Sequence, residues 1–266
     1  MQIVTPGGFP TPVPKNLIVI PIFRTKARHA LEETVVLVYV CDVDADSEWM
    51  VPFSHPDAVA VDRIEFFRWL LSSSSFPTIY TPQLMDLLRG LPEFSHSALG
   101  SKMHDMGVFE MAMAGETTMW MPVEVGYPIP RGYTVDTMPV TSIPLERLMD
   151  VYSTVGKLVL NTVKVHRDTI GSPQHQVMLN ECDFVDGIVT PNLVDVERNG
   201  IAIDRDEFLK HFNENAINLM TPNLVHTRYN VYTTTGRPSN AYAGVNYAAL
   251  NTTDESRKSF ISKYDD

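Results

Sequence analysis

Two short apolar runs in the first half of the chain restrict its fold more than any other feature. Residues 17–23 (LIVIPIF) and 35–41 (VVLVYVC) are rich in β-branched side chains, and each is far too short to span a bilayer. Such runs predict buried β-strands, and residues 48–53 (EWMVPF) predict a partner strand that returns after a polar turn. Residues 62–71 then follow helical spacing, with Asp62 as the expected N-cap. We therefore expect an α/β fold for this part of the chain.

Periodicity and helix-ending residues predict further helices along the chain. Pro82 marks the start of a helix over residues 83–88, and residues 103–114 predict another that ends at Gly115. Four prolines between residues 122 and 141 predict a linker or a long loop. Beyond it we expect helices over residues 145–166, over 183–199 (entered near Pro191 and ended by Gly200) and over 205–212 (capped by Asp204), with a short strand or turn over 201–204.

The chain is acidic, but its charge is uneven. The formal net charge is −11, which argues against simple electrostatic binding of nucleic acid. From Asn223 onward, however, five basic and four acidic residues give +1, which leaves −12 for the rest of the chain. Any site for a polyanion should therefore lie in this C-terminal segment.

Cysteine use and the N-terminus indicate the compartment. Cys41 and Cys182 are far apart and form no CxxC pair, which fits a reducing compartment and predicts neither a disulfide framework nor a thiolate metal site. The first residues, MQIVTPGGFPTPVP, lack the basic and apolar regions of a secretory signal.

Hydroxyl, amide and small side chains are concentrated in residues 225–251 (VHTRYNVYTTTGRPSNAYAGVNYAALN). Gly236 permits a tight turn or a close approach to a ligand, and the threonines before it favour extended backbone. Arg237 and Asn246 are hydrogen-bond donors suited to the minor groove of a duplex, where every base pair offers acceptors. Hydroxyls and cations such as Arg257 and Lys258 would meet the phosphates. A solvated surface loop is the competing interpretation.

The order of these residues resembles the family A DNA polymerases, the group of bacterial DNA polymerase I and many phage replicases. In that family a TGRxSS segment followed by PNLQN leads into the palm. Thr235-Gly236-Arg237 and Ser239 match the first segment, and Asn246 stands at the first Asn of NLQN. Upstream, LVDVERNGIAID (193–204) resembles the family's MExxGxxID element, and residues 257–260 (RKSF) resemble its RxxF-like segment. The two ordered matches cover the last 80 residues or so.

The resemblance implies a role for each matched residue. Arg237 and Asn246 would contact the minor groove of the primer–template duplex near the primer end. Thr235 and Ser239 would support the loop around Gly236 or touch the DNA backbone. The cations that follow would approach phosphates, and Arg257 would lie near the nucleotide-binding region. The expected DNA-binding set is Thr235, Gly236, Arg237, Ser239, Asn246, Arg257 and Lys258.

Parts of a complete family A polymerase are missing from the matched segment. The palm aspartates that hold two metal ions would follow the matched segment, and the chain stops at Asp265-Asp266. We expect no catalytic residue and no metal site in this chain, with Mg²⁺ bound only in the assembled polymerase. Only 30 residues separate Asp204 from Thr235, so the thumb is expected to be reduced.

The first half of the chain stands where the family carries its 3′–5′ exonuclease domain, of ribonuclease H-like fold. Residues 35–57 resemble the second and third strands of that domain. Its first strand needs an Asp-x-Glu pair, which LIVIPIF lacks, so we expect an inactive domain. A working nuclease built on Asp42, Asp44, Asp86 and Asp105 is an alternative. His96, His104 and Asp105 offer metal-binding atoms, but their spacing fits no common ligand pattern and favours surface histidines.

The expected organisation is therefore an inactive exonuclease-like α/β domain (1–141), a helical connector with a reduced thumb (142–222) and the start of a polymerase palm (223–266). The expected function is that of the N-terminal part or subunit of a phage-type family A DNA polymerase in DNA replication. Its partners would be primer–template DNA and a second chain carrying palm and fingers, in the bacterial cytoplasm and away from membranes. A non-enzymatic DNA-binding or assembly protein derived from a polymerase scaffold is the other hypothesis.

Overall fold

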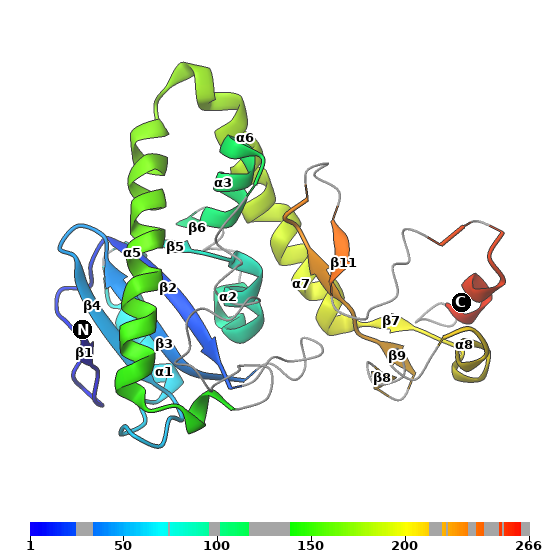
Figure 1. Cartoon of the computed structure of the whole chain (residues 1–266), viewed down its shortest axis with the longest axis horizontal. Coiled ribbons are helices and arrows are strands. Elements are labelled where there is room, and N and C mark those ends of the chain that lie inside the picture. Colours follow the sequence, from blue (N-terminus) through cyan, green and yellow to red (C-terminus); the bar gives the residue numbers. More distant parts are fainter. Residues whose placement is uncertain are drawn as a thin grey trace. The chain divides into compact units, whose positions relative to one another are not determined.

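The computed structural model of the chain divides into two compact units, which we describe one at a time (Figure 1). Unit 1 holds most residues up to Pro191, and unit 2 holds those from Asn192 onward. The structure describes residues 1–24, 34–73, 75–95, 102–116, 139–212, 220–221, 223–233, 238–241, 250–251 and 253–261. The three-part division expected from the sequence stays a prediction.

Unit 1 is built on a six-stranded mixed sheet of order β1-β4-β3-β2-β5-β6. Its strands are β1 (Gln2–Ile3), β2 (Asn16–Phe23), β3 (Val35–Asp42), β4 (Ser47–Pro52), β5 (Thr78–Thr81) and β6 (Met103–Asp105). Strand β3 is antiparallel to both of its neighbours, β2 and β4. The other pairs in the sheet, β1 with β4, β2 with β5 and β5 with β6, are parallel. The three strands predicted from the apolar runs are confirmed, and so is the α/β fold class.

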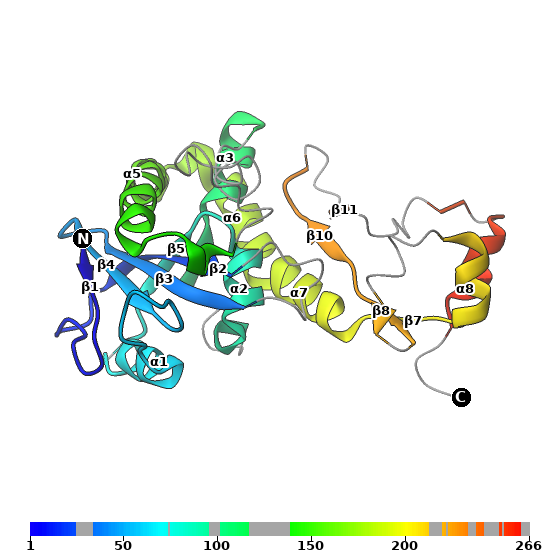
Figure 2. The same ribbon diagram turned by 60° about the horizontal axis from the view of Figure 1, so that its bottom comes forward.

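Helices cover both faces of this sheet: Figure 2 shows α5 on one side and α1 on the other. The helices of unit 1 are α1 (Arg63–Leu71), α2 (Leu84–Gly90), α3 (Met106–Ala114), α5 (Leu145–Thr169) and α6 (Gln176–Phe184), followed by a π-helical turn (Val185–Val189). Helix α7 (Thr190–Asn199) follows this turn and lies mostly in unit 2, which begins at Asn192. Short 3₁₀ turns lie at Pro92–Ser95, Val140–Ser142 and Pro173–His175. The predicted cap at Asp62 is confirmed, since its Oδ1 accepts the N–H of Ile64 at 2.7 Å.

The predicted start of the helix over residues 103–114 is wrong. Residues 103–105 form the edge strand β6, and α3 begins only at Met106, because Asp105 caps it and backbone pairing with β5 takes the residues before. The helix expected to enter near Pro191 is confirmed as α7, which begins at Thr190, and a helical run from Gln176 precedes it. The π-turn directly before α7 changes the hydrogen-bond pattern at this point, which lets a residue without an N–H stand inside a long helical run. The predicted linker falls mostly on residues 117–138, outside the described part of the chain.

The core of unit 1 lies between the sheet and α5. Strands β2 and β3 are almost entirely buried, as expected for β-branched runs covered on both faces. Val155, Val159 and Val163 recur every four residues on the face of α5 that contributes to this core. None of the described helices combines the length and the hydropathy that a membrane crossing requires.

Gly156 is the point of closest approach between α5 and the sheet. A Cβ atom at this position would lie 1.9 Å from the hydroxyl oxygen of Tyr39 on β3. That hydroxyl donates to Glu48 at 2.9 Å, and Ser153 donates to the same carboxylate at 3.0 Å. The absence of a side chain at Gly156 therefore makes room for a partly buried polar network.

Replacing Gly156 by alanine is expected to lower the free energy of unfolding by about 2 kcal/mol, because overpacking the core outweighs the better helix propensity of alanine. Urea unfolding followed by tryptophan fluorescence measures it. The control is Gly187→Ala, in the π-turn, where a Cβ would meet nothing within 4 Å. Equal stability changes in the two variants would contradict the predicted clash.

Unit 2 is built from short elements around a small apolar centre. They are β7 (Ile201–Ala202), α8 (Arg205–His211), β8 (Met220–Thr221), β9 (Leu224–Val225), β10 (Arg228–Asn230), β11 (Ser239–Ala241) and a 3₁₀ helix, η8 (Glu255–Ser259). Strands β7, β9 and β8 form a three-stranded sheet, and β10 and β11 form a separate antiparallel pair. The predicted helix over 205–212 and its cap are confirmed, because Asp204 Oδ1 accepts the N–H of Glu207 at 3.0 Å.

Candidate nucleic-acid interface

Unit 2 brings together residues 193–204 and residues 257–260, two of the segments that resemble the polymerase family. Ile203, in the upstream segment, forms an antiparallel bridge with Phe260, in the downstream segment. The N–H of Asp204 donates to the carbonyl of Ser259 at 2.8 Å, and the N–H of Ile261 donates to that of Ala202 at 3.1 Å. Backbone pairing thus joins segments more than fifty residues apart in the sequence.

Aromatic packing fixes this junction. Phe208 on α8 is fully buried and stacks on Phe212 with ring centroids 4.3 Å apart. Phe260 meets Phe208 edge-on at 6.0 Å. Ile203 and Val225 complete the buried centre. Because aromatic pairs contribute beyond the area that they bury, this cluster holds η8 against α8.

The end of α7 anchors the segment that leads into β10. Gly200 ends the helix with a φ of 67°, in the left-handed region, which confirms the predicted cap. The ring of His226 lies against it, and a Cβ on Gly200 would come within 2.8 Å of that ring. His226 Nδ1 lies 2.9 Å from the carbonyl oxygen of Glu197, so Nδ1 carries the proton and donates. The carboxylate of Glu197 is fully buried and accepts the N–H of Tyr229.

The β10–β11 pair holds one of the predicted contact residues. Asn230 on β10 pairs with Ser239 on β11, and the Ser239 side chain is half-buried. Asn230 Oδ1 accepts the N–H of Tyr232 at 2.9 Å, which turns the chain as it leaves β10. Arg228 is buried in β10 and is not presented to solvent. The predicted contacts Thr235, Gly236, Arg237 and Asn246 lie outside the described residues.

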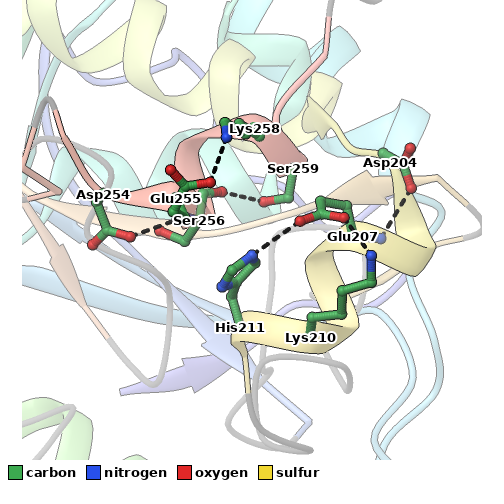
Figure 3. Close-up of polar contacts among 9 residues, drawn as sticks. All are labelled: Asp204, Glu207, Lys210, His211, Asp254, Glu255, Ser256, Lys258 and Ser259. Atoms are coloured by element: carbon green, nitrogen blue, oxygen red, sulfur yellow. Dashed lines mark hydrogen bonds and ion pairs between the residues drawn. The ribbon is translucent and has the colours of Figure 1, made fainter.

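The two predicted cations of η8 are at the surface, and Figure 3 shows Lys258 next to Glu255. Lys258 is exposed and pairs with Glu255, and this hydrogen bond raises the pKa of the lysine. Arg257 is exposed, with Nη1 3.5 Å from the carbonyl oxygen of Leu250. Asp254 caps η8 by accepting the N–H of Ser256 at 2.9 Å. A phosphate at this surface would have to compete with Glu255 for Lys258.

A second set of charges lies on α8, beside η8 (Figure 3). Glu207 accepts from Lys210 Nζ at 2.6 Å and lies 3.2 Å from His211 Nε2. Lys210 and then His211 lower the pKa of Glu207. We did not predict this group from the sequence, although the i,i+3 and i,i+4 spacings after the Asp204 cap signal it. The surface formed by α8 and η8 is therefore mixed in charge, which limits its attraction for a polyanion.

The carboxylates of the alternative nuclease have structural partners in unit 1. Asp42 Oδ1 accepts the N–H groups of Asp44 and Ala45 in the turn after β3. Asp44 pairs with Arg167 at 2.7 Å, and that ion pair lies at the surface. Asp86 forms a buried ion pair with Arg89 at 2.9 Å. Among the residues that the structure describes, no three His, Cys, Asp or Glu side chains come together as a possible metal site.

Asp105 and Asp186 form a buried contact that the sequence did not predict. Asp105 Oδ1 accepts the N–H groups of Gly107 and Val108 at 2.8 and 3.1 Å, and its Oδ2 accepts that of Leu84 at 2.7 Å. Asp105 therefore caps α3 and also holds the first turn of α2. Its own N–H donates to Asp186 Oδ2 at 3.0 Å. Burial, and then repulsion from Asp105, raise the pKa of Asp186 well above its ordinary value.

The prediction of a surface histidine at position 104 is wrong. The His104 ring is half-buried, stacked on Tyr80 at 5.4 Å and tilted against His166 at 5.0 Å. Burial lowers the pKa of His104, and burial followed by repulsion from His104 lowers that of His166 to about 4. The two rings pack against each other between β6 and α5, and His104 Nδ1 also lies 3.8 Å from Asp183 Oδ1. His96 lies outside the described residues.

Comparisons with known proteins do not assign a family. No protein-family model matches the chain, and no curated protein is significantly similar to it.

Proposed function

We propose that this chain forms the exonuclease-like and duplex-binding part of a family A DNA polymerase. The observation that carries the proposal is the union of the motif segments in unit 2. Residues 193–204 and 257–260 resemble separate elements of that family, and pairing between Ile203 and Phe260 makes them neighbours. This shared core supports the proposal.

The fold of unit 1 supports the same proposal. Without β1, its strands lie in the order third, second, first, fourth, fifth, and only the second, β3, runs against the others. This arrangement is compatible with a ribonuclease H-like domain, the fold of the family's 3′–5′ exonuclease. Strand β2 has no carboxylate. We propose that the domain is an inactive exonuclease with a scaffold role.

In this proposal, unit 2 grips the primer–template duplex without reading its sequence. Arg237 and Asn246 would donate to minor-groove acceptors, with Ser239 and Thr235 around Gly236 in support. Arg257 and Lys258 would meet phosphates, weakly, because Glu255 competes for Lys258. Palm and fingers on another polypeptide would hold Mg²⁺ and perform nucleotidyl transfer.

Replacing Arg237 by alanine is expected to weaken duplex binding about tenfold, because one donor to the base edges is lost. Fluorescence anisotropy with labelled primer–template of several sequences measures the dissociation constants, and the loss should be similar for all of them. The control is Arg205→Ala, which removes the same charge from an exposed position of α8. Equal binding by the Arg237→Ala variant and the unmodified chain would overturn the assignment of the groove contact.

The polymerase part of the proposal has its own test. Primer extension is assayed with this chain mixed with a polypeptide that carries a family A palm and fingers. Extension that needs both polypeptides supports a shared enzyme. Duplex binding without association or extension would instead favour the non-enzymatic DNA-binding or assembly protein.

A further inference from the structure

We infer that Glu197 is the positioning residue of the β10–β11 pair, and that the pair contacts duplex DNA only when this buried carboxylate holds it to α7. The inference rests on the proposed function for its DNA part. Its structural part, the attachment of β10 to α7, stands on contacts among described residues alone.

Glu197 contacts the segment that contains β10 through both its side chain and its backbone. The side chain of Glu197 accepts the N–H of Tyr229, in the middle of β10. The backbone carbonyl of the same residue accepts from the His226 ring, two residues before the strand. Gly200 leaves the space that the His226 ring occupies. Glu197 therefore connects the end of α7 to this segment at two points.

Burial makes the side-chain contact of Glu197 consequential. A fully buried carboxylate is costly unless hydrogen bonds compensate for lost hydration, and a charged acceptor makes a stronger bond to an N–H than a neutral one. The Glu197 carboxylate also acts on the side chain of Tyr229, because burial and then repulsion from Glu197 raise the pKa of the Tyr229 phenol. Glutamate is rarely fully buried without a partner, and an apolar residue at this position would serve helix α7 equally well. The contact with β10 therefore explains why a glutamate stands here.

The residue that Glu197 holds, Tyr229, lies next to the residue that pairs with the predicted contact Ser239. Asn230 follows Tyr229 directly and pairs with Ser239 on β11. A two-stranded ribbon is marginally stable by itself, so its position depends on whatever fixes one strand. Release of Tyr229 from Glu197 would leave β10 and β11 paired with each other but free to shift against α7.

The test combines a structural signal with duplex affinity in the full chain. The amide proton of Tyr229 is followed by ¹H–¹⁵N NMR, where a bond to a carboxylate places it downfield. Primer–template affinity is followed by anisotropy. The variants are Glu197→Ala, which removes the acceptor, and Glu197→Gln, which keeps an oxygen acceptor without the charge. Asp195→Ala is the matched control, because it removes one exposed carboxylate from the same helix.

We expect Glu197→Ala to lose the downfield Tyr229 signal and to weaken duplex binding about tenfold, the loss of one charge-assisted contact. Glu197→Gln should keep an intermediate shift and recover most of the affinity, and Asp195→Ala should change neither. The Glu197→Gln variant decides the question if the alanine variant fails to fold.

Two other results separate the possible failures. If the unmodified chain binds duplex and both Glu197 variants bind equally well, the positioning role is overturned while the proposed function stands. If the unmodified chain does not bind duplex at all, the proposed function and the DNA part of the inference fail together. The Tyr229 signal then still decides whether Glu197 holds β10.

Discussion

Replacing Asp105 by alanine is expected to destabilise unit 1 by about 3 kcal/mol or more, since a buried donor left without a partner costs about 1–3 kcal/mol. Three backbone N–H groups, two at the start of α3 and one at the start of α2, lose the Asp105 carboxylate together, and that of Gly107 keeps a second acceptor, the carbonyl of Pro82 at 3.2 Å. Urea unfolding measures the change. Tryptophan fluorescence reports on unit 1, because all three tryptophans precede residue 192.

Asp62→Ala is the matched control for Asp105→Ala. Asp62 is also the N-cap of a helix in unit 1, but it is exposed and accepts a single N–H. Its removal should cost about 1 kcal/mol, as at ordinary helix caps. Equal losses in the two variants would contradict the role of Asp105 as a joint between two helices.

Asp186→Asn is expected to change how the stability of unit 1 depends on pH. The folded protein raises the pKa of Asp186 above the unfolded value of 3.8, so the folded state holds the proton more tightly. The stability that this proton provides is fully present below pH 3.8. It falls as the pH rises toward the folded pKa, by about 1.4 kcal/mol per pH unit. Asparagine keeps an oxygen acceptor for the N–H of Asp105 and does not titrate.

The free energy of unfolding of the Asp186→Asn variant should therefore rise relative to that of the unmodified chain as the pH increases. The difference between the two proteins should be smallest near pH 4. Urea unfolding at several pH values between 4 and 8 measures this difference. Comparison of the two proteins also removes the contribution of His166. The pKa of His166 is lowered to about 4, so its contribution is lost as the pH falls from 6.5 toward 4, the opposite sign. Parallel pH profiles would mean that Asp186 is ionised in the fold without penalty.

Sequence patterns were sufficient for elements whose signals are local. The β-branched runs predicted β2 and β3, and alternation after a polar turn predicted β4. Caps at Asp62 and Asp204 and the left-handed glycines at 115 and 200 were also predicted, because each acts on backbone groups only a few residues away. The edge strand β6 was missed. Its three residues have no pattern of their own, and pairing with β5 makes them a strand.

The candidate interface divides in the same way. The motif residues on which the DNA-binding hypothesis depends came from the order of the sequence, and Thr235, Gly236, Arg237 and Asn246 remain predictions. The attachment of Glu197 to Tyr229, the bridge between Ile203 and Phe260 and the contact of Asp105 with Asp186 span 32, 57 and 81 residues. No local pattern encodes such pairs.

The sequence by itself determined the strands β2, β3 and β4 and the capped ends of helices, because backbone preference and capping depend on near neighbours. The tertiary structure alone decided which buried carboxylates hydrogen-bond to segments far away in the sequence. A carboxylate that leaves water must find donors wherever the packed chain provides them, and those donors belong to segments that meet only when the core closes.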